Sequence, residues 1–199
     1  MTIDLYEALQ SRRSYYAINK DVKVSDERIK EIVEFAVKHT PSSFNSQSAR
    51  VVVLTGAAHD KLWDLTTDTL KVVVGDGDFS GTQQKMDSFK AGYGTVLFFE
   101  DESVVRALQE QFALYADNFP VWSNQSSGMH QLVVWTGLEA EGLGASLQHY
   151  NPLIDEQVKA EWNIPAEWKL IAQMPFGNPA AEPGEKEFQP LDTRVKFYK

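Results

Sequence analysis

The chain has 199 residues, of which 43% are hydrophobic, 24% charged and 12% aromatic. This composition is ordinary for a globular protein and excludes collagen-like and low-complexity chains. The 19 Lys and Arg residues against 28 Asp and Glu residues give a formal net charge of −9. Such a chain is a poor candidate for general binding to nucleic acids or anionic membranes. The absence of cysteine excludes disulfides, thiol catalysis, iron–sulfur clusters and cysteine-ligated zinc.

Three further features bear on location and metal binding. The opening residues Met1–Asp4 have neither the basic nor the apolar region of a signal peptide. The longest aliphatic run, Val51–Leu54, is far shorter than the ~20 residues of a membrane span. We therefore expect a cytoplasmic protein with one domain over residues 1–199. No zinc site is expected, because the four histidines are widely spaced: His39, His59, His130 and His149.

Hydrophobic periodicity predicts five helices. The first is capped by Thr2 and ends before Arg12. The second begins at Ser25 and ends before Pro41, with a buried stripe at Ile29, Ile32, Val33, Ala36 and Val37. Further helices are predicted at residues 61–73, 102–116 and 125–141. The last of these is apolar or neutral almost all round, which indicates burial on more than one side.

Short β-branched and apolar runs predict three strands, at residues 50–54, 95–99 and 170–174. Gly142 and Gly144 end the last predicted helix and allow a close backbone approach. The C-terminal tail is rich in Pro and Glu and contains few core residues. We expect it to pack on a partner subunit, with a frayed C-terminus as the alternative. Together these elements predict an α+β fold.

Polar residues gather at the ends of predicted elements. Arg12-Arg13-Ser14 follows the first helix, and two adjacent guanidinium groups with a hydroxyl can hold a phosphate through charge-assisted hydrogen bonds. The alternative is a solvated helix end. In the segment Gly142–Pro152, small residues allow a ligand to approach the backbone amides that follow them. A glycine-capped helix followed by a buried strand explains the same residues.

The loop Pro41–Gln47, with the sequence PSSFNSQ, lies between a predicted helix and a predicted strand. Its serine, asparagine and glutamine side chains offer both donors and acceptors, which suit recognition of a heterocycle edge such as the pyrimidine ring of a flavin. The alternative is ordinary turn and cap chemistry, for which Ser and Asn are common. The loop alone does not distinguish these two explanations.

In this order, the polar clusters resemble the nitroreductase family of FMN-dependent oxidoreductases. The family's pattern is Arg-x-Ser, Pro-Ser-Ser-x-Asn-x-Gln, Gly-Leu-Gly, and Gly-x-Pro followed by a basic residue. It is matched by Arg12–Ser14, Pro41–Gln47, Gly142–Gly144, and Gly177–Pro179 with Lys186. The resemblance spans nearly the whole chain, and the second motif is its most specific part. Ala145–Pro152 and Phe119–Trp122 resemble the short subgroup of Frm2-like and copper-induced nitroreductases.

The resemblance implies an α+β, nitroreductase-like fold with a mixed central β-sheet surrounded by helices. It also implies an obligate homodimer of the domain-swapped type, in which the C-terminal tail packs on the partner. FMN is expected at the subunit interface, so that each site takes residues from two chains.

By position, the resemblance assigns the phosphate end of FMN, or the adjacent flavin edge, to Arg12, Ser14 and Lys186, with Arg13 helping. Many relatives carry a lysine two residues after the motif serine, beside the flavin N1 and O2 atoms, and here that position is Tyr16. A cation there stabilises reduced flavin, whereas a tyrosine gives at most a hydrogen bond. Either Arg13 substitutes for the lysine or the flavin has a lower potential.

The polar edge of the isoalloxazine is assigned to the loop residues Ser43, Asn45 and Gln47. The flavin N5 atom is assigned to backbone amides near His149 and Tyr150, with Gln148 alongside. The implied activity is ping-pong reduction of nitroaromatics, quinones or similar acceptors with hydride from NADH or NADPH. Aromatic residues within Tyr115–Trp122 are expected on the substrate side, with ordinary core or dimer packing as the alternative.

Two other functions stay open at this point. A flavin-binding regulator or redox sensor would hold FMN through the same residues but turn over slowly with every acceptor. A helical interaction module without a cofactor would use the acidic surface, but it leaves the polar loop Ser43–Gln47 unexplained. The sequence has no recognisable motif for the 2′-phosphate of NADPH, so it does not choose between NADH and NADPH.

Overall fold

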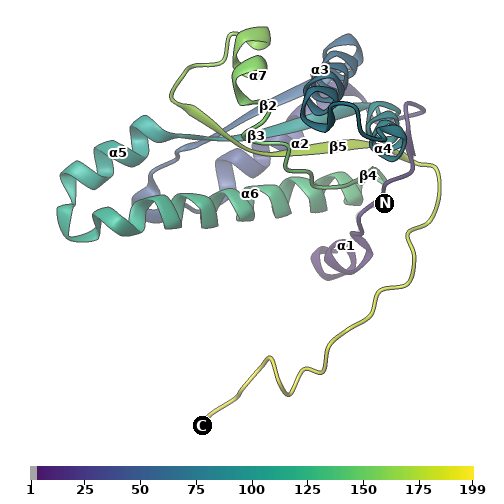
Figure 1. Ribbon diagram of the computed structural model, residues 1–199. Helices are drawn as coiled ribbons and strands as arrows, with labels where there is room; N and C mark the ends of the chain where they lie inside the picture. The colour runs from purple at the N-terminus through teal and green to yellow at the C-terminus, as the bar shows by residue number, and fades with distance from the viewer. Residues whose placement is uncertain (1–3) are drawn as a thin grey trace.

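A computed structural model describes residues 4–199, in which a five-stranded sheet lies between two layers of helices (Figure 1). The strands run in the order β1-β5-β3-β2, and β4 also pairs with β5. Their bounds are β1 Ile18–Asn19, β2 Ala49–Thr55, β3 Gly94–Asp101, β4 Gly144–Ala145 and β5 Trp168–Pro179. The three predicted strands are confirmed as β2, β3 and β5, each longer than predicted.

Every pair between these strands is antiparallel: β2 with β3, β3 with β5, and both β1 and β4 with β5. The one parallel contact between described residues is an isolated bridge that joins Ser14 to Ala145. The resemblance implied a mixed sheet, and this chain has an antiparallel one apart from that bridge. One reason is that two helices, α3 and α4, connect β2 to β3, so the chain returns in the opposite direction.

The helices cover both faces of the sheet. The bounds are α1 Leu5–Ser11, α2 Asp26–His39, α3 Gly56–Val74, α4 Ser80–Lys90, α5 Glu102–Gln111, α6 Phe119–Ala140 and α7 Asp155–Trp162, with two 3₁₀ helices, η1 Ser43–Asn45 and η2 Ala113–Asn118. In Figure 1, α3, α4 and α7 cover one face of the sheet, and α2 and α6 cover the other. Helix α5 and the start of α6 extend past the end of the sheet, and the C-terminal tail runs away from the body of the chain.

The clearest predicted helix is confirmed as α2. The Ser25 hydroxyl accepts a hydrogen bond from the Arg28 amide at 3.2 Å, which caps the helix, and α2 ends at Thr40, directly before Pro41. Four residues of its predicted stripe are buried, but Val37 is exposed. Asp4 caps α1, with its carboxylate 2.9 Å from the Glu7 amide; the predicted cap, Thr2, lies outside the described residues.

The other helices differ from the predictions mainly at their ends. Helix α6 begins at Phe119 rather than residue 125, with Pro120 in its first turn, where proline needs no amide hydrogen. Helix α5 ends at Gln111 because η2 replaces its predicted last turn. Helices α4 and α7 were not predicted. Each buries too few apolar residues to give a clear periodic stripe: Met86 and Phe89 in α4, and Val158 in α7.

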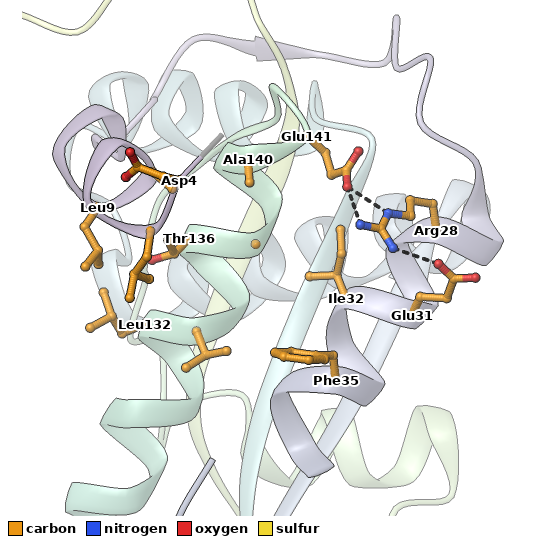
Figure 2. Close-up of a pocket in the computed structure, with 14 residues that line it drawn as sticks. Asp4, Leu9, Arg28, Glu31, Ile32, Phe35, Leu132, Thr136, Ala140 and Glu141 are labelled. Carbon is orange, nitrogen blue, oxygen red and sulfur yellow. Dashed lines mark hydrogen bonds and ion pairs between the residues drawn. The ribbon is translucent and has the colours of Figure 1, made fainter. Parts of the chain in front are cut away.

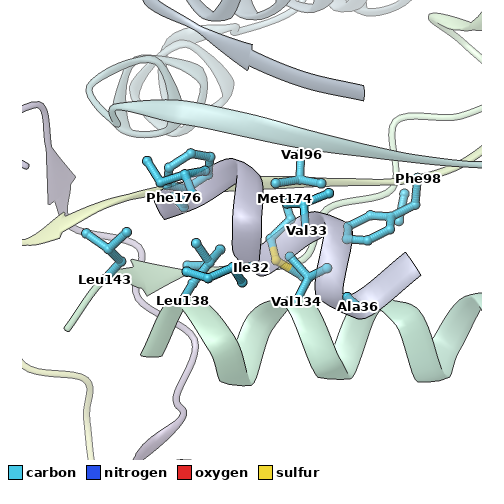
Figure 3. Close-up of a cluster of buried hydrophobic side chains, with 13 residues drawn as sticks. Ile32, Val33, Ala36, Val96, Phe98, Val134, Leu138, Leu143, Met174 and Phe176 are labelled. Atoms are coloured by element: carbon cyan, nitrogen blue, oxygen red, sulfur yellow. The ribbon is translucent and has the colours of Figure 1, made fainter. Parts of the chain in front are cut away.

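Strand β3 divides the hydrophobic core into two clusters. All of its residues are buried. Val96 and Phe98 pack toward α2 and α6, whereas Leu97 and Phe99 pack toward α3 and α4, because successive side chains of a strand point to opposite faces. Figure 3 shows the first cluster, where side chains from α2 and α6 meet those of β3 and β5. Burial of α6 against both α2 and the sheet agrees with its predicted pattern.

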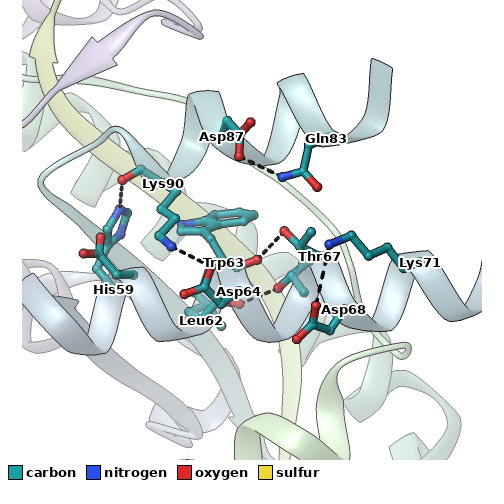
Figure 4. A network of polar contacts seen from close by, with 12 residues as sticks. His59, Leu62, Trp63, Asp64, Thr67, Asp68, Lys71, Gln83, Asp87 and Lys90 are labelled. Carbon is teal, nitrogen blue, oxygen red and sulfur yellow. Dashed lines mark hydrogen bonds and ion pairs between the residues drawn. The ribbon is translucent and has the colours of Figure 1, made fainter. Parts of the chain in front are cut away.

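A chain of hydrogen bonds lies inside the second cluster, and Figure 4 shows the bond of this chain that joins His59 to Lys90. The Thr95 hydroxyl lies 2.9 Å from His59 Nδ1 and accepts a bond from Trp63 Nε1 at 3.0 Å. His59 Nε2 lies 3.2 Å from the carbonyl oxygen of Lys90. A neutral imidazole with its proton on Nε2 satisfies all of these groups. Burial lowers the pKa of His59, which favours this neutral form.

Candidate functional site

Cationic side chains from the two ends of the chain converge on one open cavity of about 400 Å³. Arg12, Arg13 and Ser14 follow α1, and Lys186 lies in the C-terminal tail. Three positively charged side chains and one negatively charged side chain, Glu185, line the cavity. The structure therefore brings together the four residues to which the sequence assigned the phosphate end of a cofactor.

Each cation of this cavity is held by a particular contact. The Arg12 guanidinium lies 4.4 Å from the centroid of the Trp135 ring, a cation–π arrangement that fixes its plane. Arg13 Nη2 donates to the carbonyl oxygen of Gly184 at 2.5 Å and so links the segment after α1 to the C-terminal tail. Lys186 Nζ lies 5.2 Å from the ring centroid of Phe188. The sequence pattern did not indicate the support from Trp135, because α6 and Arg12 are far apart in the chain.

Tyr15 and Tyr16 also line this cavity, and they differ in exposure. Tyr16, at the position of the missing lysine, is 57% exposed. Burial raises the pKa of Tyr15, and the charges of Glu139 and Glu182 raise it further against the lowering effect of Arg13. Tyr15 is therefore neutral near pH 7, and the positive charge on this side of the cavity comes from the arginines.

The segment that begins at Gly142 lies directly beside Arg12–Ser14. Ser14 bridges to Ala145, and the Tyr15 amide donates to the Ala145 carbonyl oxygen at 2.9 Å. Gly144 is needed for this approach, because a Cβ atom there would lie only 2.7 Å from the Tyr15 ring. The segments Arg12–Ser14 and Gly142–Pro152, which are far apart in the sequence, are thus neighbours in one chain.

The residues predicted near flavin N5 are anchored by one residue of β5, Gln173. Gln173 accepts from the Gln148 amide through its backbone oxygen and from the Tyr150 amide through Oε1, both at 2.7 Å. Gln148 is buried, with Nε2 donating to the Ser146 hydroxyl at 3.0 Å. His149 between them is exposed, and no hydrogen bond to its amide occurs within residues 4–199. Of these three amides, only that of His149 has no described partner.

The polar loop Pro41–Gln47 adopts an unusual backbone. Phe44, Asn45 and Gln47 all have positive φ angles, of 56°, 51° and 49°, in the left-handed region that residues other than glycine seldom occupy. A bond of 3.0 Å from the Gln47 amide to the Ser42 hydroxyl closes the loop. Asn45 and Gln47 are exposed. Local backbone strain of this kind persists where the surroundings enforce it and is common at functional sites.

An aromatic cluster surrounds Phe44 at the tip of the α5–α6 hairpin. The ring centroids of Phe112, Phe119, Tyr115 and Trp122 lie 4.8, 5.3, 6.1 and 6.2 Å from that of Phe44. Phe44 itself remains 52% exposed. The residues predicted on the substrate side are therefore neighbours of the polar loop, and the cluster presents aromatic surface to solvent.

Within one chain, helix α6 keeps the polar loop apart from the cationic cavity. The loop contacts α6 near its start, where the Ser126 hydroxyl donates to the Pro41 carbonyl oxygen at 3.1 Å. Arg12 contacts α6 at Trp135. At 1.5 Å per residue these points lie about 14 Å apart along the helix. The residues predicted to hold opposite parts of one ligand thus form two separate groups in the chain.

An apolar groove of about 650 Å³ lies between α1, α2 and α6 (Figure 2). Leu9, Phe35 and Leu132 line it and remain partly exposed. At one end Arg28 bonds to Glu141 and Glu31. The groove's one arginine is thus already paired with two glutamates, whereas the cationic cavity brings three positively charged side chains together.

A model of the nitroreductase family matches residues 9–178. The chain belongs to the nitroreductase family. Two yeast (Saccharomyces cerevisiae) relatives are the putative nitroreductase HBN1, 36% identical over 95% of both chains, and the nitroreductase FRM2, 33% identical over 91% of both. The nitroreductase CinD from Lactococcus lactis, solved with nicotinic acid, has a TM-score of 0.93 and 49% identity, covering 98% of this chain and all of that one. The predicted family and its Frm2-like subgroup are confirmed.

Two kinds of feature were not found among the described residues. In residues 4–199, no group of three or more His, Asp or Glu side chains is arranged to hold a metal ion. No helix in that range has both the length and the apolar character needed to cross a membrane. The positively charged side chains that converge in the cationic cavity are Arg12 and Arg13 of the first motif and Lys186 of the tail.

Proposed function

We propose that this chain is an FMN-dependent oxidoreductase. The observation that carries the proposal is the cationic cavity, where Arg12, Arg13 and Lys186 meet beside the Ser14 hydroxyl. This donor set suits a phosphate dianion, because guanidinium and ammonium groups form strong charge-assisted bonds with phosphate oxygens. The same fold occurs in a putative nitroreductase from Exiguobacterium sibiricum that was solved in complex with FMN, with a TM-score of 0.70 and 14% identity.

The rest of the proposed site has the chemistry of a flavin ring. Ser43, Asn45 and Gln47 supply donors and acceptors for the polar edge of the ring, and the free amide of His149 is a donor for N5. Gln148 and Tyr150, locked by Gln173, keep that amide in place. Arg13 is the cation proposed to stand in for the missing lysine beside N1 and O2.

We propose that a second copy of the chain completes the site. The loop and the cationic cavity form two separate groups on α6 within one chain, and we propose that one flavin contacts the loop of one subunit and the cavity of the other. The apolar groove offers a surface for the second copy, since Leu5, Leu9, Phe35 and Leu132 expose apolar area on it. The tail carries further exposed apolar side chains, at Phe188, Leu191, Val195, Phe197 and Tyr198, and we propose that these pack on the partner.

Bound FMN would supply the redox chemistry, accepting hydride from NAD(P)H and passing two electrons to an acceptor. The protein binds the phosphate, orients the ring and keeps one ring face open to both substrates in turn, which is a ping-pong scheme. The aromatic cluster around Phe44 favours planar acceptors such as nitroaromatics and quinones. Solved complexes of CinD with 4-nitrophenol and with chloramphenicol support nitroaromatics as one class of acceptor.

The absorbance spectrum of the purified protein tests this proposal. We expect a yellow protein with about one FMN per chain, bleached by NADH or NADPH and recoloured by a quinone or a nitroaromatic. Steady-state oxidation of NAD(P)H with several acceptors separates an enzyme from a redox sensor, because a sensor turns over slowly with all of them. A colourless protein that takes up no added FMN would overturn the proposal.

A further inference from the structure

A buried carboxyl group at the end of β3 connects two parts of the proposed site. Glu100 is only 3% exposed. Its Oε2 atom accepts hydrogen bonds from the Ser48 hydroxyl at 2.6 Å and the Ser123 hydroxyl at 2.8 Å. Its Oε1 atom is buried and has no hydrogen-bond partner within residues 4–199. A glutamate is rarely buried without a cation paired to it, because removing a carboxylate from water costs free energy. The two serine bonds offset part of this cost.

The two serines each lie next to a segment of the proposed site. Ser48 directly follows Gln47, the last residue of the polar loop, and Ser123 directly follows Trp122 of the aromatic cluster. Glu100 therefore joins the end of the loop to the helix that carries the aromatic side chains. Phe44 bridges the same two segments on the outside, with its ring stacked on Trp122 at 6.2 Å.

Neighbouring bonds make the base of the loop rigid. The Asp101 amide donates to the Ser48 carbonyl oxygen at 2.9 Å. Arg50 donates to the Gln47 carbonyl oxygen at 2.8 Å and to the Asp101 carboxylate at 2.9 Å. These bonds fix the loop to the sheet, and the carboxyl of Glu100 adds a link from the end of the loop to α6, besides the bond of Ser126 to Pro41 at the start of the loop.

We propose that Glu100 is a positioning residue that sets the spacing between the polar loop and the aromatic cluster, and with it the fit of the aromatic acceptor. The inference rests on the proposed function, because it assigns those two segments to one site. Glu100 is not a catalytic residue in this proposal, since it acts only through Ser48 and Ser123. Removing its carboxyl leaves two hydroxyl groups without their acceptor and breaks the link between α6 and the end of the loop at Ser48, while the bond of Ser126 to Pro41 at the start of the loop remains.

The proton on Glu100 makes this link depend on pH. Burial raises the pKa of Glu100, against the lowering effects of the two serine hydroxyls and of electrostatic interactions with His130 and Arg50. Glu100 also lines a polar cavity of about 140 Å³ with Glu102, Arg106 and Lys169, so these charges face it as well. An ionised carboxylate accepts hydrogen bonds more strongly than a neutral carboxyl. We therefore expect both serine bonds to strengthen as pH rises through the raised pKa of Glu100.

Two substitutions separate the link from its titration. Glu100→Gln keeps an oxygen acceptor for both serines but cannot ionise, whereas Glu100→Leu keeps most of the volume and removes the acceptor. Glu102→Gln is the matched control, because Glu102 lines the same cavity and its ion-pair partners are Arg106 and Lys169 rather than the serines. All three variants are made in the full chain and compared with the unchanged protein.

Hydrogen–deuterium exchange tests the link without any turnover. In Glu100→Leu, we expect faster exchange at the amides of residues 42–48 and 119–124, with or without added FMN. Glu100→Gln and Glu102→Gln should leave both segments close to the unchanged protein. Infrared spectroscopy provides a second readout, because a protonated carboxyl band that titrates above the range of ordinary glutamates should vanish in Glu100→Gln and persist in Glu102→Gln.

Steady-state kinetics with a nitroaromatic test the consequence for the site. We expect Glu100→Leu to raise the acceptor KM by roughly tenfold, which corresponds to about 1.4 kcal/mol, the upper range of one net hydrogen bond, with a smaller change in kcat. In Glu100→Gln the pH dependence of the acceptor KM should flatten. Unchanged exchange and an unchanged KM in Glu100→Leu would overturn this inference while FMN binding upheld the proposed function. A chain that binds no FMN but shows the exchange change would instead overturn the proposed function alone.

Discussion

The helices that cover the two faces of the sheet bury their large apolar side chains to different degrees. On the face covered by α3, α4 and α7, the large side chains Leu62, Trp63 and Phe89 are fully buried. The polar groups inside that layer form the closed chain of bonds at His59. On the face covered by α2 and α6, Phe35 and Leu132 stay partly exposed. The chain completes the first layer by itself and leaves apolar surface on the second.

In the described part of the chain, buried polar atoms without a partner occur at two positions of α6, and another, Asp155 Oδ1, lies at the start of α7 on the opposite face. Trp135 Nε1 and Thr136 Oγ1 are buried, and neither has a hydrogen-bond partner within residues 4–199. Both lie on the helix that separates the cationic cavity from the polar loop. Buried polar atoms in stable proteins normally have partners. The exposed apolar side chains of the α2–α6 side, together with these two atoms of α6, therefore support a role for that side in contacts that one chain cannot make.

The largest effect on the proposed dimer is expected from a charge placed in the apolar groove between α1, α2 and α6. We expect Leu132→Glu to raise the dissociation constant of the proposed dimer by at least about 100-fold, because a buried unpaired charge costs several kcal/mol. Sedimentation measures the dimer, and the FMN-to-chain ratio should fall with it. Val72→Glu is the control, since Val72 at the end of α3 is 83% exposed. A Leu132→Glu protein that stays dimeric and yellow would contradict the two-chain site.

Thr95→Val tests the closed face. The substitution is nearly isosteric, but it leaves His59 Nδ1 and Trp63 Nε1 without their shared partner. We expect the free energy of unfolding to fall by about 2–4 kcal/mol, since each unsatisfied buried group costs about 1–3 kcal/mol. FMN affinity should not change. Thr66→Val is the control, because the equally buried Thr66 hydroxyl bonds only to a carbonyl of its own helix; an equal loss in both variants would show that the shared partner has no special role.

Arg12→Ala sharpens the assignment of the cationic cavity. We expect FMN affinity to fall by a factor of roughly 10 to 100, because a charge-assisted hydrogen bond is worth about 1.5–3 kcal/mol. Fluorescence titration with FMN measures the change. Arg106→Ala serves as the control, since Arg106 lies on α5 and is paired with Glu102 of the same helix and with Glu167 directly before β5. Unchanged affinity in Arg12→Ala would argue against phosphate binding at this cavity.

The sequence predicted the elements whose patterns are local. Helix α2 has a cap, an apolar stripe and a following proline, and its bounds are confirmed. Helix α4 buries only Met86 and Phe89, so no local pattern marked it, and missing it removed a clue to the antiparallel pairing of β2 and β3. A prediction from periodicity fails where tertiary packing, rather than an amphipathic face, holds the helix.

The candidate site divides in the same way. The motifs placed Arg12, Arg13, Ser14 and Lys186 together across almost the whole length of the chain, and the structure brings them to one cavity. No motif indicated that Trp135 supports Arg12 or that Glu100 joins the polar loop to α6. These contacts arise from the crossing of distant elements, where a single residue carries no periodic or spaced signal. The left-handed backbone of Phe44 is likewise imposed by its surroundings, since its sequence would permit an ordinary turn.

The smallest expected effect concerns the pH dependence of the closed face. Burial lowers the pKa of His59 in the folded chain, while in the unfolded chain it titrates near ~6.5. Below that pH the unfolded chain binds a proton that the folded chain does not, so this group makes folding less favourable as pH falls, by at most about 1.4 kcal/mol per pH unit. Urea unfolding at pH 7.5 and pH 5.5 measures the loss, and His59→Gln should reduce it. An equal loss in both proteins would assign the acid sensitivity to the carboxylates and not to the buried imidazole.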